Sequence, residues 1–197
     1  KSTILKTIAR IIQAKSGDIF VNNINIKEQS PKDLAKVMAV LPQSPQAPSG
    51  LTVEELIAYG RFPHQKGFGK MKKEDEDIVT WALKSTGIEE FRERPMEALS
   101  GGQRQRAWIA MALAQQTEIL ILDEPTTYLD LAHQLEILKL LEELNRKQGT
   151  TIVMVIHELN NAARFADHMI GVKKGKVVCQ GTAHEVMTKE NLKELFN

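Results

Sequence analysis

This sequence of 197 residues has little cysteine, a small net charge and no long apolar run. Its one cysteine, Cys179, cannot form a disulfide within the chain, which favours a reducing compartment and a structural role for the thiol. With 26 lysines and arginines against 25 aspartates and glutamates, the net charge of +1 gives no electrostatic reason to expect nucleic acid as a partner. The apolar runs, such as residues 152–156, are much shorter than the roughly 18 residues of a membrane helix. We therefore expect a chain that is soluble by itself and meets a membrane only through a partner.

Alternating helix and strand patterns dominate most of the chain. Short apolar runs predict strands, and apolar residues at helical spacing predict helices between them. This alternation predicts an α/β fold whose mostly parallel sheet is covered by helices on both faces. The predicted strands are residues 19–21, 37–41, 119–122 and 151–156, and a hairpin is predicted from residues 169–172 and 177–180; the predicted helices are residues 3–14, 102–114, 131–147 and 160–166. Leucines at positions 131, 135, 138, 141 and 144 mark the expected buried face of the longest helix.

A helical segment interrupts this α/β pattern. Residues 44–95 predict helices and loops only, with a capping box that starts at Thr52 and a surface loop over residues 61–75. Ser30 and Thr182 also match helix N-caps. We expect two parts: a core from residues 1–43 and 115–197, and a helical subdomain from residues 44–114.

Two carboxylates follow the apolar run 119–122 directly. Asp123 and Glu124 would lie at the carboxyl end of a buried strand, which is where open α/β sheets bind ligands. One carboxylate could hold Mg²⁺, and the other could orient or deprotonate an attacking water. Taken alone, the same residues also fit an apolar strand that ends in an acidic turn.

A glycine pair, Gly101 and Gly102, lies at the start of the predicted helix 102–114. Ser100, Gly101, Gly102 and Gln103 would place backbone amides at a helix N-terminus, where an anion can bind. An ordinary serine cap with glycines at a turn is the alternative. The acidic strand end about twenty residues further along favours the anion site.

The order of three motifs resembles the ATP-binding-cassette (ABC) transporter family. These motifs are Leu99-Ser-Gly-Gly-Gln103, the apolar strand with Asp123-Glu124, and a later strand that ends at His157. The resemblance implies a P-loop NTPase (RecA-like) fold that binds ATP and Mg²⁺ and hydrolyses ATP. It also implies that two copies dimerise head to tail, with each nucleotide held between them.

The resemblance assigns a role to each motif residue. Asp123 would hold magnesium through water, Glu124 would be the general base, and His157 would contact the γ-phosphate. Gln43 would sense magnesium and face the membrane partner. Ser100, Gly101, Gly102 and Gln103 would bind the partner's ATP, and Asp130 would lie on a loop that crosses the dimer interface. A lone histidine or loop glutamine is ordinarily just solvated, so Gln43 and His157 depend on their position at strand ends.

The first three residues resemble the end of a phosphate-binding loop. Lys1 would pair with the β- and γ-phosphates, Ser2 would ligand magnesium, and Thr3 would complete the motif at the start of a helix. On this interpretation the domain is truncated at its N-terminus. A fragment that keeps the fold without binding ATP is then one alternative.

Two further stretches resemble the subgroup that serves iron–siderophore, haem and cobalamin importers. They are residues 51–64 and 126–134. The resemblance implies an importer ATPase at the cytoplasmic face of the cell membrane, docked through its helical subdomain to a permease. A soluble ABC-type ATPase is the other alternative. DNA-repair and translation relatives of that kind carry long coiled coils or a second cassette, and neither is visible here.

Overall fold

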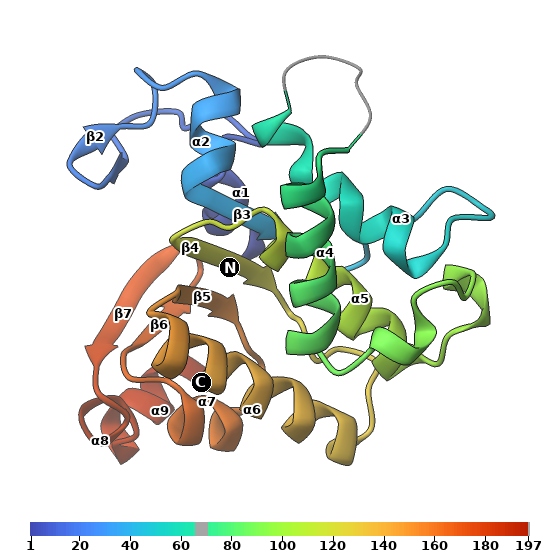
Figure 1. Cartoon of the computed structure of the whole chain (residues 1–197). Coiled ribbons are helices and arrows are strands. Elements are labelled where there is room, and N and C mark those ends of the chain that lie inside the picture. The colour runs from blue at the N-terminus through green and yellow to red at the C-terminus, as the bar shows by residue number, and fades with distance from the viewer. Residues whose placement is uncertain (66–70, 197) are drawn as a thin grey trace.

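The computed structural model describes residues 1–65 and 71–196, and its centre is a three-stranded parallel sheet (Figure 1). The strands are β3 (Met38–Leu41), β4 (Ile119–Asp123) and β5 (Thr151–Val155), in the order β3-β4-β5. Their register pairs residue 41 with 122 and residue 123 with 155. The carboxyl ends of all three strands therefore meet at one edge, as the sequence predicted for an α/β fold.

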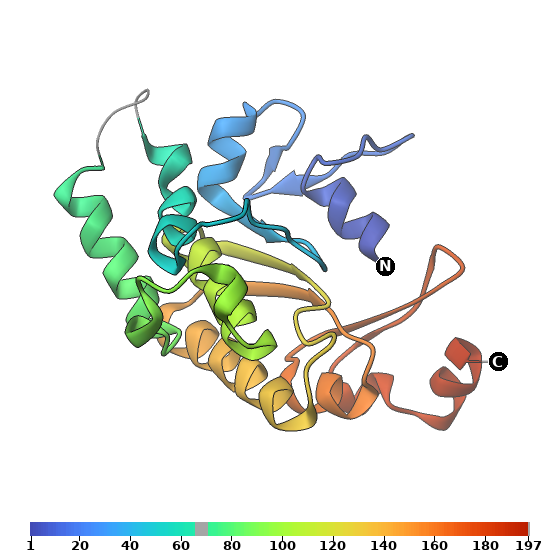
Figure 2. The same cartoon turned by 90° about the vertical axis from the view of Figure 1, so that its right-hand side faces the viewer.

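Both faces of the central strand β4 are buried, because its apolar side chains alternate between two cores, whereas Val153 of β5 is 38% exposed. Leu120 and Leu122 belong to a core with α5 (Gly101–Ala114) and α6 (Leu131–Gln148). Ile121 belongs to a second core with α1 (Ser2–Ile8) and α2 (Pro31–Val37). Figure 2 shows α1 and α2 on one side of the strands, with α5 and α6 on the other. Each fully buried leucine or isoleucine contributes about 1.5–3 kcal/mol.

The helices between β3 and β4 pack together beside the sheet (Figure 1). They share one core with the sheet face that Leu120 and Leu122 form. In chain order they are α3 (Val53–Ala58), the 3₁₀ helix η1 (Tyr59–His64), α4 (Lys73–Ser85), the 3₁₀ turns η2 (Glu89–Phe91) and η3 (Met96–Ala98), and α5. The division into two subdomains with boundaries at residues 44 and 114 stays a prediction.

The remaining elements flank this centre. A short hairpin joins β1 (Phe20–Val21) to β2 (Ile24–Asn25), and β2 was not predicted. The predicted second hairpin is confirmed as β6 (Met169–Lys173) and β7 (Lys176–Gly181). The other helices are α7 (Leu159–Phe165), α8 (Ala183–Val186) and α9 (Lys189–Phe196).

Three predicted helix caps are present. The Ser30 hydroxyl accepts a hydrogen bond from the Asp33 amide at 3.1 Å. Thr52 and Thr182 each start a complete capping box. A cap of this kind contributes about 1 kcal/mol to stability.

Three sequence predictions were wrong. The first helix ends at Ile8 and not at residue 14, because Arg10 has a φ of 56° and its guanidinium bonds the carbonyl oxygens of residues 26 and 29. Leu131 is 65% exposed, and Ile137 lies in the buried face of α6 in its place. The predicted loop 61–75 contains the end of η1 and the start of α4, and its Arg61 is buried. Residues 66–70 of that loop lie outside the described residues.

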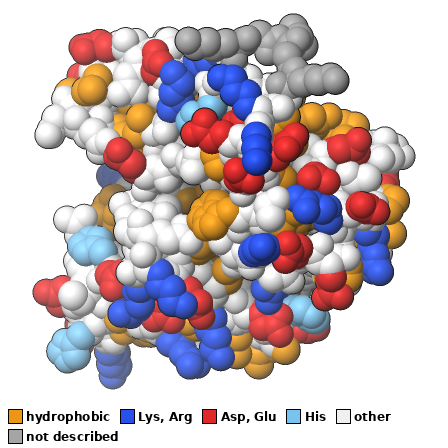
Figure 3. Space-filling model, in the orientation of Figure 1, with side chains coloured by type: hydrophobic (Ala, Val, Ile, Leu, Met, Phe, Trp, Pro, Cys, Tyr) orange, Lys and Arg blue, Asp and Glu red, His pale blue; other side chains and the backbone are white. Residues whose placement is uncertain are grey.

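Over the residues that the structure describes, no helix has the length and apolar character that are needed to cross a membrane. Charged side chains of both signs are interspersed over the face seen in Figure 3, which agrees with the balanced charge of the chain. The surface of this face therefore carries mixed charge and no field of one sign.

Candidate functional site

The Glu124 carboxylate is the centre of a cluster at the carboxyl edge of the sheet. Its Oε2 accepts a hydrogen bond from Gln43 Nε2 at 2.6 Å, and its Oε1 lies 2.5 Å from His157 Nε2. Gln43 follows β3, Glu124 follows β4 and His157 follows β5. The parallel sheet thus brings together three residues that are separated by 81 and 33 positions in the chain.

Asp123 is paired with the first helix of the chain. The Ser2 hydroxyl donates a hydrogen bond to Asp123 Oδ1 at 2.8 Å, across 121 residues of sequence. Asp123 is buried at the last position of β4, whereas Ser2 is half-buried at the start of α1. A hydroxyl oxygen and a carboxylate oxygen are therefore side by side next to Glu124.

The turn after β4 has a strained backbone. Glu124 and Tyr128 have φ values of 55° and 66°, in the left-handed region that residues other than glycine rarely adopt. Within this turn the Thr127 hydroxyl donates to Glu124 Oε2 at 3.0 Å. Sequence reasoning missed this role of Thr127, although its position three residues after Glu124 in a turn is a usable signal. Thr127 is thus the third side chain, after Gln43 and His157, that bonds the Glu124 carboxylate.

Glu124 is mostly buried, with 14% of its side chain exposed. Burial raises the pKa of Glu124, but the hydrogen bonds from His157 and Thr127, with the charges of His157 and Lys1, outweigh it. The pKa therefore lies below its ordinary value of 4.5, and the carboxylate is ionised at neutral pH. An ionised, desolvated carboxylate can accept a proton or orient a water.

The surface beside this cluster is hollowed. Tyr128 is 88% exposed at its rim, and the His157 side chain is 61% exposed. The lining residues come from the turn after β4, from α6 and from the end of β5: Glu124, Thr126, Thr127, Tyr128, Gln134, Val155, Ile156, His157 and Glu158. The cluster is thus accessible to a ligand from solvent.

The glycine pair lies at the start of α5, as predicted. Ser100 caps the helix through a capping box with Gln103. A Cβ atom on Gly102 would lie 2.8 Å from the His133 ring, so α5 and α6 approach closely there. Within the described residues, the Ser100 hydroxyl accepts from the Gln103 amide and the Ser100 amide donates to Gln103 Oε1, so neither group bonds the Glu124 cluster. The two motifs are therefore separate surfaces of this chain.

Asp130 is the N-cap of α6. Its Oδ1 accepts from the His133 amide at 2.9 Å, and its Oδ2 lies 2.8 Å from His133 Nδ1. These bonds, the backbone bond first, hold the pKa of Asp130 below its usual value. The sequence did not identify His133, which contacts both Asp130 and Gly102. Of the three N-terminal motif residues, Lys1 and Thr3 are exposed, and the Lys1 charge acts on Glu124.

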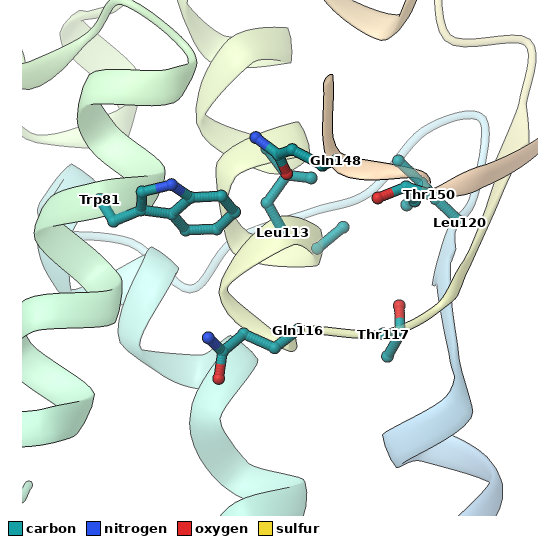
Figure 4. A pocket seen from close by; sticks show the side chains of 8 residues that line it. Trp81, Leu113, Gln116, Thr117, Leu120, Gln148 and Thr150 are labelled. Carbon is teal, nitrogen blue, oxygen red and sulfur yellow. The ribbon is translucent and has the colours of Figure 1, made fainter. Parts of the chain in front are cut away.

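A second hollow lies at the opposite, amino-terminal edge of the sheet (Figure 4). Trp81 of α4 borders it on one side, and Gln148 and Thr150 border it on the other. The remaining lining residues are Ala112, Leu113, Gln116, Thr117 and Leu120. None of these side chains is an acid or a base near neutral pH, so this hollow offers no acid–base chemistry.

The parallel sheet with a carboxylate, a glutamine and a histidine at its carboxyl edge defines an α/β protein whose ligand site is equipped with a general base. A family model described as ABC transporter matches residues 1–127. The chain belongs to this family, and it is an ATP-binding, ATP-hydrolysing cassette.

Curated relatives support the same assignment. The iron(3+)-hydroxamate import ATP-binding protein FhuC of Bacillus subtilis is 64% identical over 196 residues, which cover 100% of this chain and 73% of that protein. The achromobactin transport ATP-binding protein CbrD of Dickeya dadantii is 49% identical, with coverage of 100% and 73%.

Solved structures show the same fold. CbiO1 of Clostridium perfringens, part of the transporter complex CbiONQ, has a TM-score of 0.84 at 30% identity and covers 98% of this chain and 76% of its own. The dimeric cassette MJ0796 bound to ADP and phosphate has a TM-score of 0.77 at 30% identity, with coverage of 92% and 80%. The predicted P-loop NTPase fold is confirmed.

Proposed function

We propose that this ATPase energises the uptake of a ferric siderophore of the hydroxamate type through a membrane permease. The hydrogen-bonded cluster of Gln43, Glu124 and His157 is the observation that carries the catalytic part. The transported class is supported by FhuC, a relative that is named for the import of iron(3+)-hydroxamate.

Glu124 is the catalytic base in this proposal. It orients a water and accepts its proton as the water oxygen bonds to the γ-phosphorus of ATP and the bond to the β-γ bridging oxygen breaks. ADP and inorganic phosphate are the products. His157 and Gln43 fix the carboxylate, and the exposed His157 ring is placed to contact the γ-phosphate.

The residues around Asp123 fit a magnesium ion. Magnesium prefers oxygen ligands and keeps several waters, so a site needs few protein ligands. The Ser2 hydroxyl and the Asp123 carboxylate supply oxygens 2.8 Å apart, and Gln43 can supply its amide oxygen while its nitrogen bonds Glu124. When bound, the ion would neutralise charge on the β- and γ-phosphates. Lys1 and Thr3 complete the phosphate-facing end of α1.

The second half of each site comes from another copy of the chain. Ser100, Gly101 and Gly102 lie at the N-terminus of a 14-residue helix and do not contact Glu124, which fits a role toward a partner's nucleotide. Gln103 closes their capping box, and Asp130 fixes the loop that would cross the interface. The dimeric cassette MJ0796 with ADP and phosphate supports this arrangement.

The helical subdomain, residues 44–114, would be the docking site for the permease. Gln43 lies where this segment leaves β3, so a movement of the docked permease would reach the Glu124 cluster directly. The ATPase would then lie peripherally at the cytoplasmic face of the membrane. Nucleic acid has no part in this function.

The test compares two glutamates that flank the same strand, β4. Glu124→Gln removes the base, whereas Glu118→Gln changes a carboxylate that precedes β4 at the opposite edge of the sheet. We expect Glu124→Gln to abolish ATPase activity and uptake of ferric hydroxamate in cells, and Glu118→Gln to retain both. Normal ATPase activity in Glu124→Gln would overturn the catalytic assignment. Intact ferric hydroxamate uptake in cells that lack the protein would overturn the transport assignment.

A further inference from the structure

Arg61 is buried in the described structure, although arginine is rarely buried without a partner. Only 4% of this residue is exposed, and its Nε donates to Asp75 Oδ1 at 2.8 Å. Asp75 is 8% exposed at the start of α4. Apolar residues of similar size would stabilise such a position at least as well as an ion pair, so stability alone does not account for this pair.

The rest of the guanidinium faces the C-terminal end of α5. Arg61 Nη1 donates to the Ala114 carbonyl at 2.7 Å and to Gln116 Oε1 at 3.1 Å. His64, also on η1, lies 2.8 Å from the Gln115 carbonyl through its Nε2. The last carbonyl groups of a helix lack partners within the helix and carry partial negative charge. The 3₁₀ helix η1 therefore caps α5.

The same end of α5 is also tied to the strand that leads to Gln43. The Gln115 side chain donates to the carbonyl oxygens of Ala35 and Met38, at the junction of α2 and β3. A Cβ atom on Gly60 would lie 2.2 Å from the Met111 carbonyl oxygen, so η1 is seated directly on α5. One junction thus joins η1, α4, α5 and β3.

The other end of α5 carries Ser100, Gly101 and Gly102. The helix has 14 residues, so its two ends are about 20 Å apart. A regular helix moves as a rod, and a change of direction at its C-terminal end displaces its N-terminal end. The contacts of Arg61 at the C-terminal end of α5 can therefore determine the position of the glycine pair at its N-terminal end.

We propose that Arg61, held by Asp75, is a positioning residue that sets the orientation of α5 and so places Ser100–Gly102 against the nucleotide of a second copy. This rests on the proposed function of the glycine pair. Arg61 contacts no reacting group, so its loss leaves the chain's own nucleotide site intact. Its effect is confined to the site that the two copies form together.

The test separates positioning from stability. Three variants are compared in the Glu124→Gln background, where ATP-dependent dimers are expected to accumulate because the bound ATP is not hydrolysed. They are Arg61→Leu, the double variant Arg61→Leu/Asp75→Leu, and Arg61→Lys. Arg61→Leu leaves an unpaired buried carboxylate and melts at a lower temperature, whereas the double variant regains stability. Arg61→Lys retains a charge for Asp75 but cannot hold Ala114 and Gln116 at the same time.

We expect both the double variant and Arg61→Lys to need about tenfold or more ATP for half-maximal dimerisation, although both are stably folded. Binding of a fluorescent ATP analogue to the monomer should not change. Dimerisation at the parental ATP concentration in either variant would overturn the positioning role. In the double variant it would mean that a filled cavity is enough, and in Arg61→Lys it would mean that a buried charge pair is enough.

Ser100→Arg in the same background is the control for the proposed function. It should abolish ATP-dependent dimerisation, since it blocks the surface that meets the partner's nucleotide. Dimerisation that survives Ser100→Arg would mean that the proposed divided site is wrong. Loss with Ser100→Arg but not with the Arg61 variants would mean that only the positioning role is wrong.

Discussion

Thr127→Val tests how Glu124 is kept ionised. The substitution preserves the side-chain volume and removes the hydroxyl that donates to Glu124 Oε2 at 3.0 Å. A hydrogen bond to a charged group contributes about 1.5–3 kcal/mol, and the Glu124 side chain is only 14% exposed, so screening by solvent is weak. We expect the free energy of unfolding at pH 7 to fall by about 1.5 kcal/mol or more.

The loss of stability in Thr127→Val should depend on pH. The pKa of Glu124 is lowered in the folded state, so its stabilising contribution is present above the ordinary value of 4.5 and is lost as pH falls through the lower, folded value. In Thr127→Val the pKa is lowered less, and less stability is lost on acidification. The difference in unfolding free energy between parent and variant should therefore shrink below pH 4.5.

Urea unfolding at a series of pH values measures this difference. Thr151→Val is the matched control, because Thr151 is exposed at the start of β5, at the opposite edge of the sheet. We expect this control to follow the parent at every pH. A Thr127→Val deficit that stays constant from neutral to acidic pH would refute the reasoning, because it would then reflect packing and not the Glu124 charge.

Two further substitutions test other parts of the account. His157→Ala removes the bond to Glu124 Oε1 and should lower ATPase activity by about a hundredfold or more. The pKa of Glu124 should rise, so the acid limb of the pH–rate profile should move to higher pH. An acid limb that does not move would show that His157 has no effect on the ionisation of Glu124. Gly60→Ala places a Cβ atom against the Met111 carbonyl oxygen and should destabilise the protein by about 1–3 kcal/mol in thermal unfolding. An unchanged melting temperature would show that η1 is not seated on α5 as described.

Features that depend on local pattern were predictable from the sequence. The apolar run 119–122 followed by two carboxylates gave β4 and the position of Glu124, and parallel pairing then placed Gln43 and His157 beside it. Local hydrogen bonding likewise gave the caps at Ser30 and Thr52. These features need only neighbouring residues and the rule that parallel strands share a carboxyl edge.

Features that depend on distant contacts were not predictable. Arg10 ends α1 by bonding carbonyl oxygens 16 and 19 residues further along. Arg61 is buried because the carbonyl of Ala114, 53 residues away, and the Asp75 carboxylate meet it. A charged residue in a polar stretch gives no sign of such partners, and the surface-loop prediction for residues 61–75 was wrong for that reason.

We propose that each ATP site is divided between two copies of the chain. Mixed dimers of Glu124→Gln and Ser100→Arg, with the two copies joined covalently so that they stay together, test this arrangement through their ATPase activity. When the two substitutions are in separate copies, we expect one intact site and measurable hydrolysis. When both are in one copy beside an unaltered partner, we expect no intact site and no hydrolysis. The reverse pattern would contradict the account, because each copy would then serve its own nucleotide alone.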